Sequence, residues 1–210
     1  MNVLVIGANG KIGRQIVQKL ALEKGYFVRA MIRDVHQTEA LEKLGGKPII
    51  ADLEKDFRYA YDEVDAVVFT AGSGGHTGPD KTIAVDQDGA IRAIQFAKEK
   101  NVPRFVMISS IHAGEPDKGP SSLAHYLTAK GKADQALIES GLDYTIIRPV
   151  TLTDGAGTGK VSDPAISGNT TIPRADVAAF ASAVLPVKES YGKIYELATG
   201  ETEIEHYLTS

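Results

Sequence analysis

Four side chains in the middle of the chain are of the types that move protons to and from a carbonyl group. Ser109 and Ser110 end the apolar run RFVMISS, and Tyr126 and Lys130 follow within HYLTAK. On a helix, residues four apart lie on one face, about one turn from each other. An ammonium group beside a phenol favours the phenolate, and a serine hydroxyl can hold a carbonyl oxygen close to that phenol. This set predicts acid–base chemistry on a carbonyl or an alcohol, with the phenol of Tyr126 close to the oxygen that reacts.

The Tyr-x-x-x-Lys spacing alone is weak evidence, because an exposed tyrosine and lysine occur at this spacing on many helices. A glycine pattern near the N-terminus strengthens it. The sequence VIGANGKIG places Gly7, Gly10 and Gly13 at intervals of three, where an apolar run ends and an amphipathic stretch begins. In dinucleotide-binding turns the first glycine permits a tight turn, the second lets a pyrophosphate approach the backbone, and the third lets the helix pack closely. The new helix presents free N–H groups and the positive end of its dipole to the phosphates.

The spacing here is G-x-x-G-x-x-G rather than G-x-G-x-x-G, so close packing of a strand against a helix is the alternative explanation. Because the pattern lies at the first strand–helix junction, we interpret it as a phosphate-binding loop. The nucleotide type depends on a position about 20 residues further on, where the chain has Arg33 followed by Asp34. A guanidinium pairs well with a 2′-phosphate, so Arg33 predicts NADP as the cofactor. NAD is the alternative, because a small shift in register would place Asp34 on the ribose and leave Arg33 as a solvated residue at a strand end.

The elements that must position these residues alternate along the chain. Apolar runs rich in Val, Ile and Phe predict strands at 2–7, 27–32, 47–52, 66–72, 104–110, 144–149 and 193–198. Helical periodicity predicts helices at 11–24, 37–44, 81–100, 123–140 and 174–185. Several strands are apolar almost throughout, as in sheets buried on both faces, and the alternation indicates βαβ crossovers. We therefore predict the α/β class, with residues 1–210 forming a single doubly wound Rossmann-type domain whose mostly parallel sheet is flanked by helices.

Residues 151–173 depart from this alternation. They read TLTDGAGTGKVSDPAISGNTTIP, dense in Gly, Thr and Ser, with little periodicity. A plain surface loop is one interpretation, but loops of this length in a compact domain are more often functional. We predict a substrate-side flap containing one or two short strands.

The bulk composition excludes several classes of function. The 210 residues carry a formal net charge of -4, which gives no general attraction to nucleic acid or to an anionic membrane. The chain has no cysteine, and its five histidines are scattered without the spacing of metal ligands, so we expect no metal site. Neither a signal peptide nor a membrane-spanning run is visible. We expect a cytoplasmic protein whose partner is a small-molecule substrate, with its oligomeric state open.

The ordered series of motifs resembles the short-chain dehydrogenase/reductase superfamily. The series consists of GANGKIG, ADL at 51–53, TAG at 70–72, ISS, Y-x-x-x-K, and YTIIRP followed by IPRADVA. Within the superfamily the chain is most similar to the compact atypical members, which include NmrA-like and biliverdin-reductase-B-like NAD(P)-binding proteins. Bacterial members of this kind are often described only as NAD-dependent epimerase/dehydratase-like. The resemblance covers essentially the whole chain.

The resemblance implies a role for each matching residue. Tyr126 would donate the proton, Lys130 would assist it and bind the cofactor ribose, and Ser109 and Ser110 would lie beside the nicotinamide. The remaining cofactor contacts would come from the pyrophosphate turn, the end of the second strand, the adenine and ribose borders, and the nicotinamide side: Gly7, Asn9, Gly10, Lys11, Ile12, Gly13, Arg33, Asp52, Leu53, Thr70, Ala71, Gly72, Pro149, Val150 and Leu152.

Together these observations predict an NADP(H)-dependent oxidoreductase acting by hydride transfer on a small carbonyl, alcohol or conjugated substrate. Two alternatives stay open. An epimerase or dehydratase would act through a transient keto intermediate, and the short segment after Pro149 leaves little room for the substrate domain of a large sugar-nucleotide epimerase. A sensor of NADP(H) would use the same fold without turnover, because a fold by itself does not specify a function.

Overall fold

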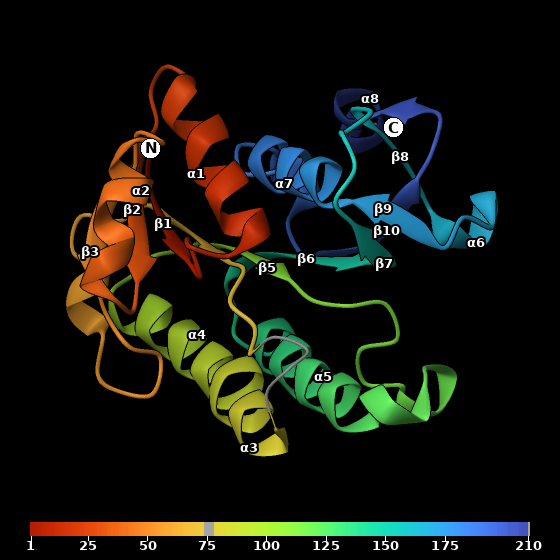
Figure 1. Cartoon of the computed structure of the whole chain (residues 1–210), viewed down its shortest axis with the longest axis horizontal. Helices are drawn as coiled ribbons and strands as arrows, with labels where there is room; N and C mark the ends of the chain where they lie inside the picture. The colour runs from red at the N-terminus through yellow and green to blue at the C-terminus, as the bar shows by residue number, and fades with distance from the viewer. Residues whose placement is uncertain (74–77, 210) are drawn as a thin grey trace.

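The computed structural model describes residues 1–73 and 78–209, and within them a nine-stranded sheet forms the centre of the molecule (Figure 1). Seven of its strands run parallel: β1 (Asn2–Ile6), β2 (Phe27–Ile32), β3 (Lys47–Ile50), β4 (Ala66–Phe69), β5 (Arg104–Ile108), β6 (Asp143–Pro149) and β10 (Lys193–Thr199). Two short antiparallel strands, β8 (Lys160–Ser162) and β11 (Thr202–Glu203), extend one edge. All seven predicted strands are therefore confirmed.

The α-helices of the described residues are α1 (Lys11–Leu22), α2 (Thr38–Glu42), α3 (Pro79–Lys81), α4 (Ala90–Glu99), α5 (Ala124–Ile138), α6 (Pro164–Ser167), α7 (Arg174–Ala183) and α8 (Ile204–Thr209). A π-helical stretch, η3 (Thr82–Gly89), leads into α4. Single 3₁₀ turns are η1 (Val35–Gln37), η2 (Arg58–Tyr61), η4 (Pro116–Lys118), η5 (Ser121–Leu123) and η6 (Lys188–Ser190). None of the helices within these residues is both long and apolar enough to cross a bilayer.

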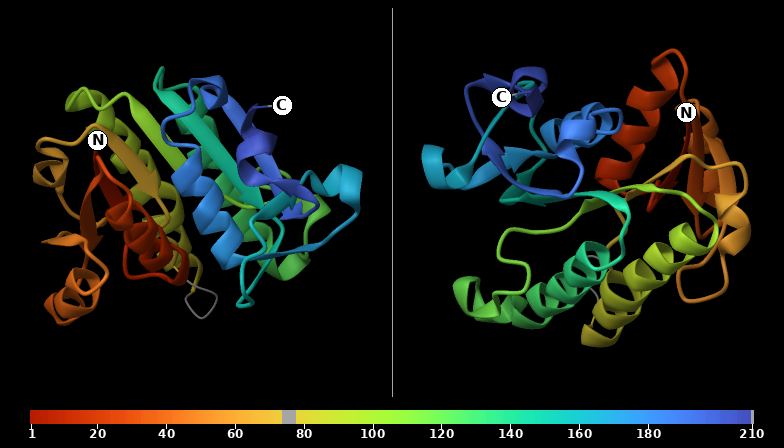
Figure 2. Two further views of the ribbon diagram at one scale, coloured as in Figure 1. Left: turned by 90° about the horizontal axis from the view of Figure 1, so that it is seen from above. Right: turned by 180° about the vertical axis from the view of Figure 1, so that it is seen from behind.

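The strand order is β11-β8-β10-β6-β5-β4-β1-β2-β3, so the chain first builds outward from β1 to β3 and then returns to the other side of β1. This order confirms the doubly wound sheet. Helices α1 and α7 cover one face and α4 and α5 cover the other, as Figures 1 and 2 show from three directions. In such sheets, ligands bind outside the carboxyl ends of the strands, where the strand order reverses. Here that point lies between β1 and β4.

The first strand shows why the predicted strands read as continuous apolar runs. Successive side chains of a strand point to opposite faces. Val3 and Val5 belong to the core cluster under α1 and α7, whereas Leu4 and Ile6 belong to the cluster on the other face. All four side chains are fully buried. A strand in the centre of a two-sided sheet therefore has no solvent-facing position for a polar residue.

Residues 151–173 contain more regular structure than the sequence indicates. They form three short strands rather than one or two, together with the four-residue helix α6. Strand β7 (Thr151–Thr153) pairs with β9 (Thr171–Pro173), and β8 between them joins the edge of the main sheet. The buried carboxylate of Asp176, in the first turn of α7, accepts hydrogen bonds from the backbone N–H groups of Thr158 and Gly159, at 3.0 and 2.8 Å. The segment is thus closed by the pairing of β7 with β9 and held to the domain through β8 and Asp176.

Candidate functional site

The glycine turn after β1 is shaped by backbone contacts. Gly7 has φ +81°, and a Cβ there would lie 2.6 Å from the backbone nitrogen of Ala71. A Cβ on Gly13 would overlap the carbonyl oxygen of Gly7, so this glycine lets α1 pack onto the turn. Gly10 differs from both, because the single atom near its added Cβ would be the same carbonyl oxygen, at 3.3 Å. Gly10 therefore keeps the approach to the turn open.

The N-terminus of α1 has the properties of an anion site. Its N-cap residue is Gly10, no side chain caps it, and its first turn contains no acidic residue. Helix N-termini carry free N–H groups and partial positive charge. The side chain of Asn9 accepts a hydrogen bond from Nε of Arg14 at 3.0 Å, which fixes the turn to the helix. The local geometry therefore fits a pyrophosphate, as the sequence predicts.

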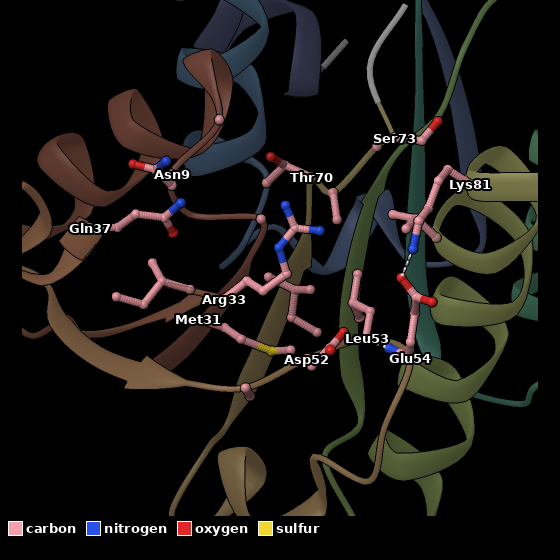
Figure 3. A pocket seen from close by; sticks show the side chains of 18 residues that line it. Asn9, Met31, Arg33, Gln37, Asp52, Leu53, Glu54, Thr70, Ser73 and Lys81 are labelled. Atoms are coloured by element: carbon pink, nitrogen blue, oxygen red, sulfur yellow. Dashed lines mark hydrogen bonds and ion pairs between the residues drawn. The ribbon is translucent and has the colours of Figure 1, made fainter. Parts of the chain in front are cut away.

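A first cavity of about 510 Å³ opens in front of this turn (Figure 3). The guanidinium of Arg33 points into it, and Arg33 makes no hydrogen bond with any described residue. The acidic neighbour Asp34 is not among the lining residues. An ion pair of 2.6 Å between Lys81 and Glu54 crosses one border of the cavity. The predicted residues that line it are Gly7, Asn9, Gly10, Arg33, Asp52, Leu53, Thr70, Ala71 and Gly72.

A second cavity of about 450 Å³ continues from the first, with which it shares Gly10 and residues 70–73. The predicted residues that it adds are Lys11, Ile12, Ser109, Tyr126, Lys130 and Leu152. One cleft thus runs along the carboxyl ends of the strands, from Arg33 to Tyr126. The structure brings the glycine turn and the Ser–Tyr–Lys set to the same cleft.

Tyr126 and Lys130 differ in their surroundings. Tyr126 is half-buried, and its hydroxyl makes no hydrogen bond with the described residues, which leaves it available to a bound molecule. Lys130 is 2% exposed, and its ammonium donates a hydrogen bond to the carbonyl oxygen of Ile108 at 2.9 Å. A lysine ammonium has three hydrogens, so two more can be donated within the cavity.

Behind Lys130 lies a buried carboxylate. Asp134, one turn further along α5, pairs with Nε of Arg148 at 2.9 Å, and its side chain is 2% exposed. Burial raises the pKa of the Asp134 carboxyl, while Ser109, Lys130 and Arg148 partly oppose this rise. The ion pair of Asp134 with Arg148 thus lies behind Lys130 and Ser109, which line the cavity.

Buried polar atoms without partners gather at this cleft. Within the described residues they are the hydroxyl oxygens of Thr70 and Ser109 and one carboxylate oxygen each of Asp86 and Asp134. Three of these residues line the cleft, and the fourth lies behind Ser109. Because buried polar groups in native proteins are nearly always hydrogen-bonded, such exceptions need an explanation. A bound molecule or ordered water in the cleft would supply the missing partners.

Four predicted site residues lie outside both cavity walls. Ser110 is half-buried and accepts a hydrogen bond from the backbone of Ala113, so Ser109 alone of the serine pair reaches the cavity. Pro149 and Val150 are held in backbone hydrogen bonds with neighbouring segments. Gly13 packs α1 onto the turn. These four residues are placed to support the lining rather than to form it.

Sequence reasoning also missed several lining residues, among them Gln37, Asp86 and Arg174. Asp86 had a recognisable pattern: it precedes Ala90 and Ala93 at helical spacing, and all three are fully buried. An acidic residue on an otherwise small and apolar helix face is unusual. Arg174 lies within the IPRADVA motif, but the motif does not reveal which way its side chain points.

Comparisons with known proteins agree with this geometry. Residues 7–187 match the model of a family described as NAD(P)H-binding. The chain is 40% identical over 211 residues to the uncharacterised sugar epimerase YhfK of Bacillus subtilis (strain 168), covering 99% of both proteins.

Two solved structures are similar over nearly their whole length. One, from Bacillus halodurans and provisionally described as an NAD-dependent epimerase/dehydratase, has a TM-score of 0.95 and 43% identity, covering 100% of this chain and 99% of that one. The oxidoreductase ylbE from Lactococcus lactis has a TM-score of 0.88 and 28% identity, covering 100% and 95%. With the glycine turn, the cleft and the strand order, these matches show that the chain belongs to the NAD(P)H-binding family of Rossmann-type proteins, within the atypical short-chain dehydrogenase/reductase superfamily.

Proposed function

We propose that this protein is an NADP(H)-dependent oxidoreductase that transfers hydride to or from a small carbonyl, alcohol or conjugated substrate. One observation carries the proposal: Ser109, Tyr126 and Lys130 line a cavity that is continuous with the cavity of the glycine turn. A nicotinamide cofactor bound along this cleft would have its reactive end beside these three side chains.

The residues of the cleft fit the parts of such a cofactor. Gly10 and the N-terminus of α1 would hold the pyrophosphate, and Arg33 would pair with the 2′-phosphate. Asp52 and Leu53 would border the adenine. When bound, the nicotinamide supplies or accepts the hydride. The protein supplies orientation and the proton.

In the direction of reduction, the carbonyl carbon gains a hydride and its oxygen gains a proton from the phenol of Tyr126. Ser109 would hold the same oxygen by a hydrogen bond. Lys130, buried at the base of the cavity, would stabilise the phenolate that is left and contact the cofactor ribose. Leu152, in the segment 151–173, lines the cavity too, which supports a place for this segment on the substrate side.

The names of two relatives favour different reactions. The Lactococcus lactis structure is described as an oxidoreductase, whereas YhfK is called a sugar epimerase. An epimerase would oxidise its substrate to a keto intermediate and then reduce it again, so the cofactor would not be consumed. Net NADPH oxidation therefore separates the two reactions.

The experiment is a screen of small aldehydes, ketones and quinones for NADPH oxidation, with Tyr126→Phe in parallel. A positioned acid contributes about 10²–10⁴-fold, so turnover should fall by that factor while NADPH affinity stays unchanged. Tyr144→Phe, at a half-buried tyrosine outside both cavities, is the matched control and should keep full activity. Activity that survives Tyr126→Phe would refute the proton-donor role. Bound NADPH without oxidation, together with a protein partner whose affinity changes with NADP(H), would favour the sensor over the reductase.

A further inference from the structure

Two cations from distant parts of the chain lie on the wall of the second cavity. Lys11 is the first residue of α1, and Arg174 is the first residue of α7. The carboxylate of Asp154, which follows β7, bridges them: one oxygen lies 2.6 Å from Nζ of Lys11, and the other lies 2.7 Å from Nη1 of Arg174. A carboxylate therefore already binds at this position, supplied by the protein itself.

The charges around this position do not cancel. Lys11 and Arg174 contribute two positive charges and Asp154 one negative charge, which leaves an excess of one positive charge. Among the described residues, the single acidic side chain that lines the cavity is Asp86, whose carboxylate is fully buried and accepts a hydrogen bond from the backbone of Ser73. One further anionic group would balance the local charge.

The guanidinium of Arg174 has donors to spare. Its Nη1 donates to Asp154 and, at 3.4 Å, to the carbonyl oxygen of Leu152, whereas its Nε and Nη2 donate to none of the described residues. An arginine presents paired N–H groups that match a carboxylate in a bidentate geometry. The side chain is 25% exposed, so water screens its charge less than that of a fully solvated arginine.

Much of the rest of the wall is apolar. Ile12, Ile108, Leu123 and Leu152 line the same cavity, together with the ring of Tyr126. A ligand suited to this cavity combines an apolar body with one anionic group at the side of Arg174. Lys11, adjacent to Gly10, is placed for the pyrophosphate end, which leaves Arg174 for the other ligand.

We propose that the substrate carries an anionic group, of the carboxylate type, that binds the free Nε and Nη2 edge of Arg174 while its reacting oxygen faces Tyr126. The placement of the reacting oxygen beside Tyr126 rests on the proposed function. The anion-binding role of Arg174 is independent of turnover. Asp154 leaves this edge open but weakens its attraction for an anion, because its carboxylate partly neutralises the guanidinium from the Nη1 side.

Binding to the protein loaded with NADP⁺ tests the proposal, since an oxidised cofactor cannot reduce the probe. The probes are 4-formylbenzoate and its uncharged methyl ester, measured by calorimetry. We expect the carboxylate to bind at least tenfold more tightly than the ester, and Arg174→Gln to remove this preference by losing a charge-assisted bond worth about ten- to a hundredfold. Arg58→Gln changes an arginine whose ion pairs lie outside both cavities and should keep the preference.

Two further variants keep the test decisive if Arg174→Gln does not fold. Arg174→Lys should retain a reduced preference for the carboxylate, and Asp154→Asn should increase the affinity for the carboxylate severalfold by removing a negative charge beside Arg174. Equal binding of both probes to the unmutated protein would overturn the proposal. So would a preference that survives Arg174→Gln, or an equal loss of NADP⁺ affinity in that variant, which would assign Arg174 to the pyrophosphate. Selective binding without NADPH oxidation would contradict the proposed reaction while supporting the anion site.

Discussion

Arg33 and Asp34 are neighbours at the end of β2, but their side chains have different environments. Arg33 points into the first cavity, whereas Asp34 accepts a hydrogen bond from the backbone N–H of His36 at 2.9 Å and caps the following 3₁₀ turn. The residue able to pair with a 2′-phosphate is thus the one directed into the cavity. Asp34, the acidic type of residue found in NAD sites, instead caps the 3₁₀ turn η1.

This relationship predicts a preference for NADPH over NADH. The Arg33→Ala variant should lose most of the difference, because a charge-assisted phosphate contact contributes about 1.5–3 kcal/mol, or about ten- to a hundredfold in affinity. Asp34→Asn keeps an oxygen for the cap and should leave both affinities near those of the unmutated protein. Fluorescence titrations with the two cofactors give the answer. Equal affinities in the unmutated protein would refute the role of Arg33.

The glycine turn gives a second prediction, because Gly10 and Gly13 respond differently to a side chain. Gly10 has φ -69° and ψ 164°, which a β-branched residue accepts, and its added Cβ would face little protein. Gly10→Val should therefore fold normally and lose dinucleotide binding, because the side chain fills the pyrophosphate approach. Gly13→Val should instead lower the melting temperature, since its side chain would overlap Gly7. A folded Gly10→Val protein that binds NADPH normally would mean that the turn serves packing alone.

The sequence predicted the central strands and the main helices because their apolar patterns are set by burial on both faces of the sheet. It did not predict β11, which has two residues, and it placed one or two short strands in residues 151–173, where three form. Such short strands at an edge depend on pairing partners far away in the chain rather than on their own pattern. The π-helical stretch before α4 was likewise missed, because its sequence has ordinary helical propensity.

In the candidate site, too, some features follow from local sequence spacing and others depend on contacts between distant segments. The turn and the Ser–Tyr–Lys set could be predicted, since local spacing determines which of their residues share a turn or a helix face. The bridge from Lys11 through Asp154 to Arg174 could not, because it joins three segments that meet only in the folded protein. The distinction between Ser109 and Ser110 is also tertiary, since adjacent residues at a strand end differ only in which way they point.

The buried Asp134 carboxyl predicts a pH-dependent contribution to stability. Burial raises the pKa of Asp134 in the folded protein above its ordinary value of about 3.9. Between these two pKa values the folded state binds more protons than the unfolded state. The stability from this group is therefore fully present below the ordinary value and is lost as the pH rises through the folded value.

Denaturant unfolding at pH 7, 5 and 4 measures this contribution in the unmutated protein and in Asp134→Asn, which cannot titrate. The free energy of unfolding of the unmutated protein, relative to that of the variant, should increase as the pH is lowered. Asp117→Asn, at an exposed position on η4, is the control for general effects of charge. A relative stability that decreases toward pH 4 would show that the ion pair with Arg148, and not burial, dominates the titration.

Asp86 supports the last prediction, because it connects the π-helical stretch to the loop that lines both cavities. One oxygen of its carboxylate accepts the backbone N–H of Ser73 at 3.0 Å. The other has no hydrogen-bond partner among the described residues, and a Cβ added to Gly72 would lie 3.2 Å from it. The carboxylate thus holds the backbone that continues from β4 along the wall of both cavities.

Removing this support should weaken the binding of both cofactors alike, since residues 70–73 line both cavities of the cleft in which we propose that either cofactor binds. A buried hydrogen bond that leaves one partner unsatisfied costs about 1–3 kcal/mol, so we expect Asp86→Ala to lower both affinities by about tenfold or more. Asp86→Asn keeps an oxygen for Ser73 and should bind close to normally. Titrations of both variants with both cofactors, after their melting temperatures are compared, test this. If Asp86→Asn is as weak as Asp86→Ala in a folded protein, the negative charge itself is required, and the oxygen without a partner would then be the one that meets the ligand.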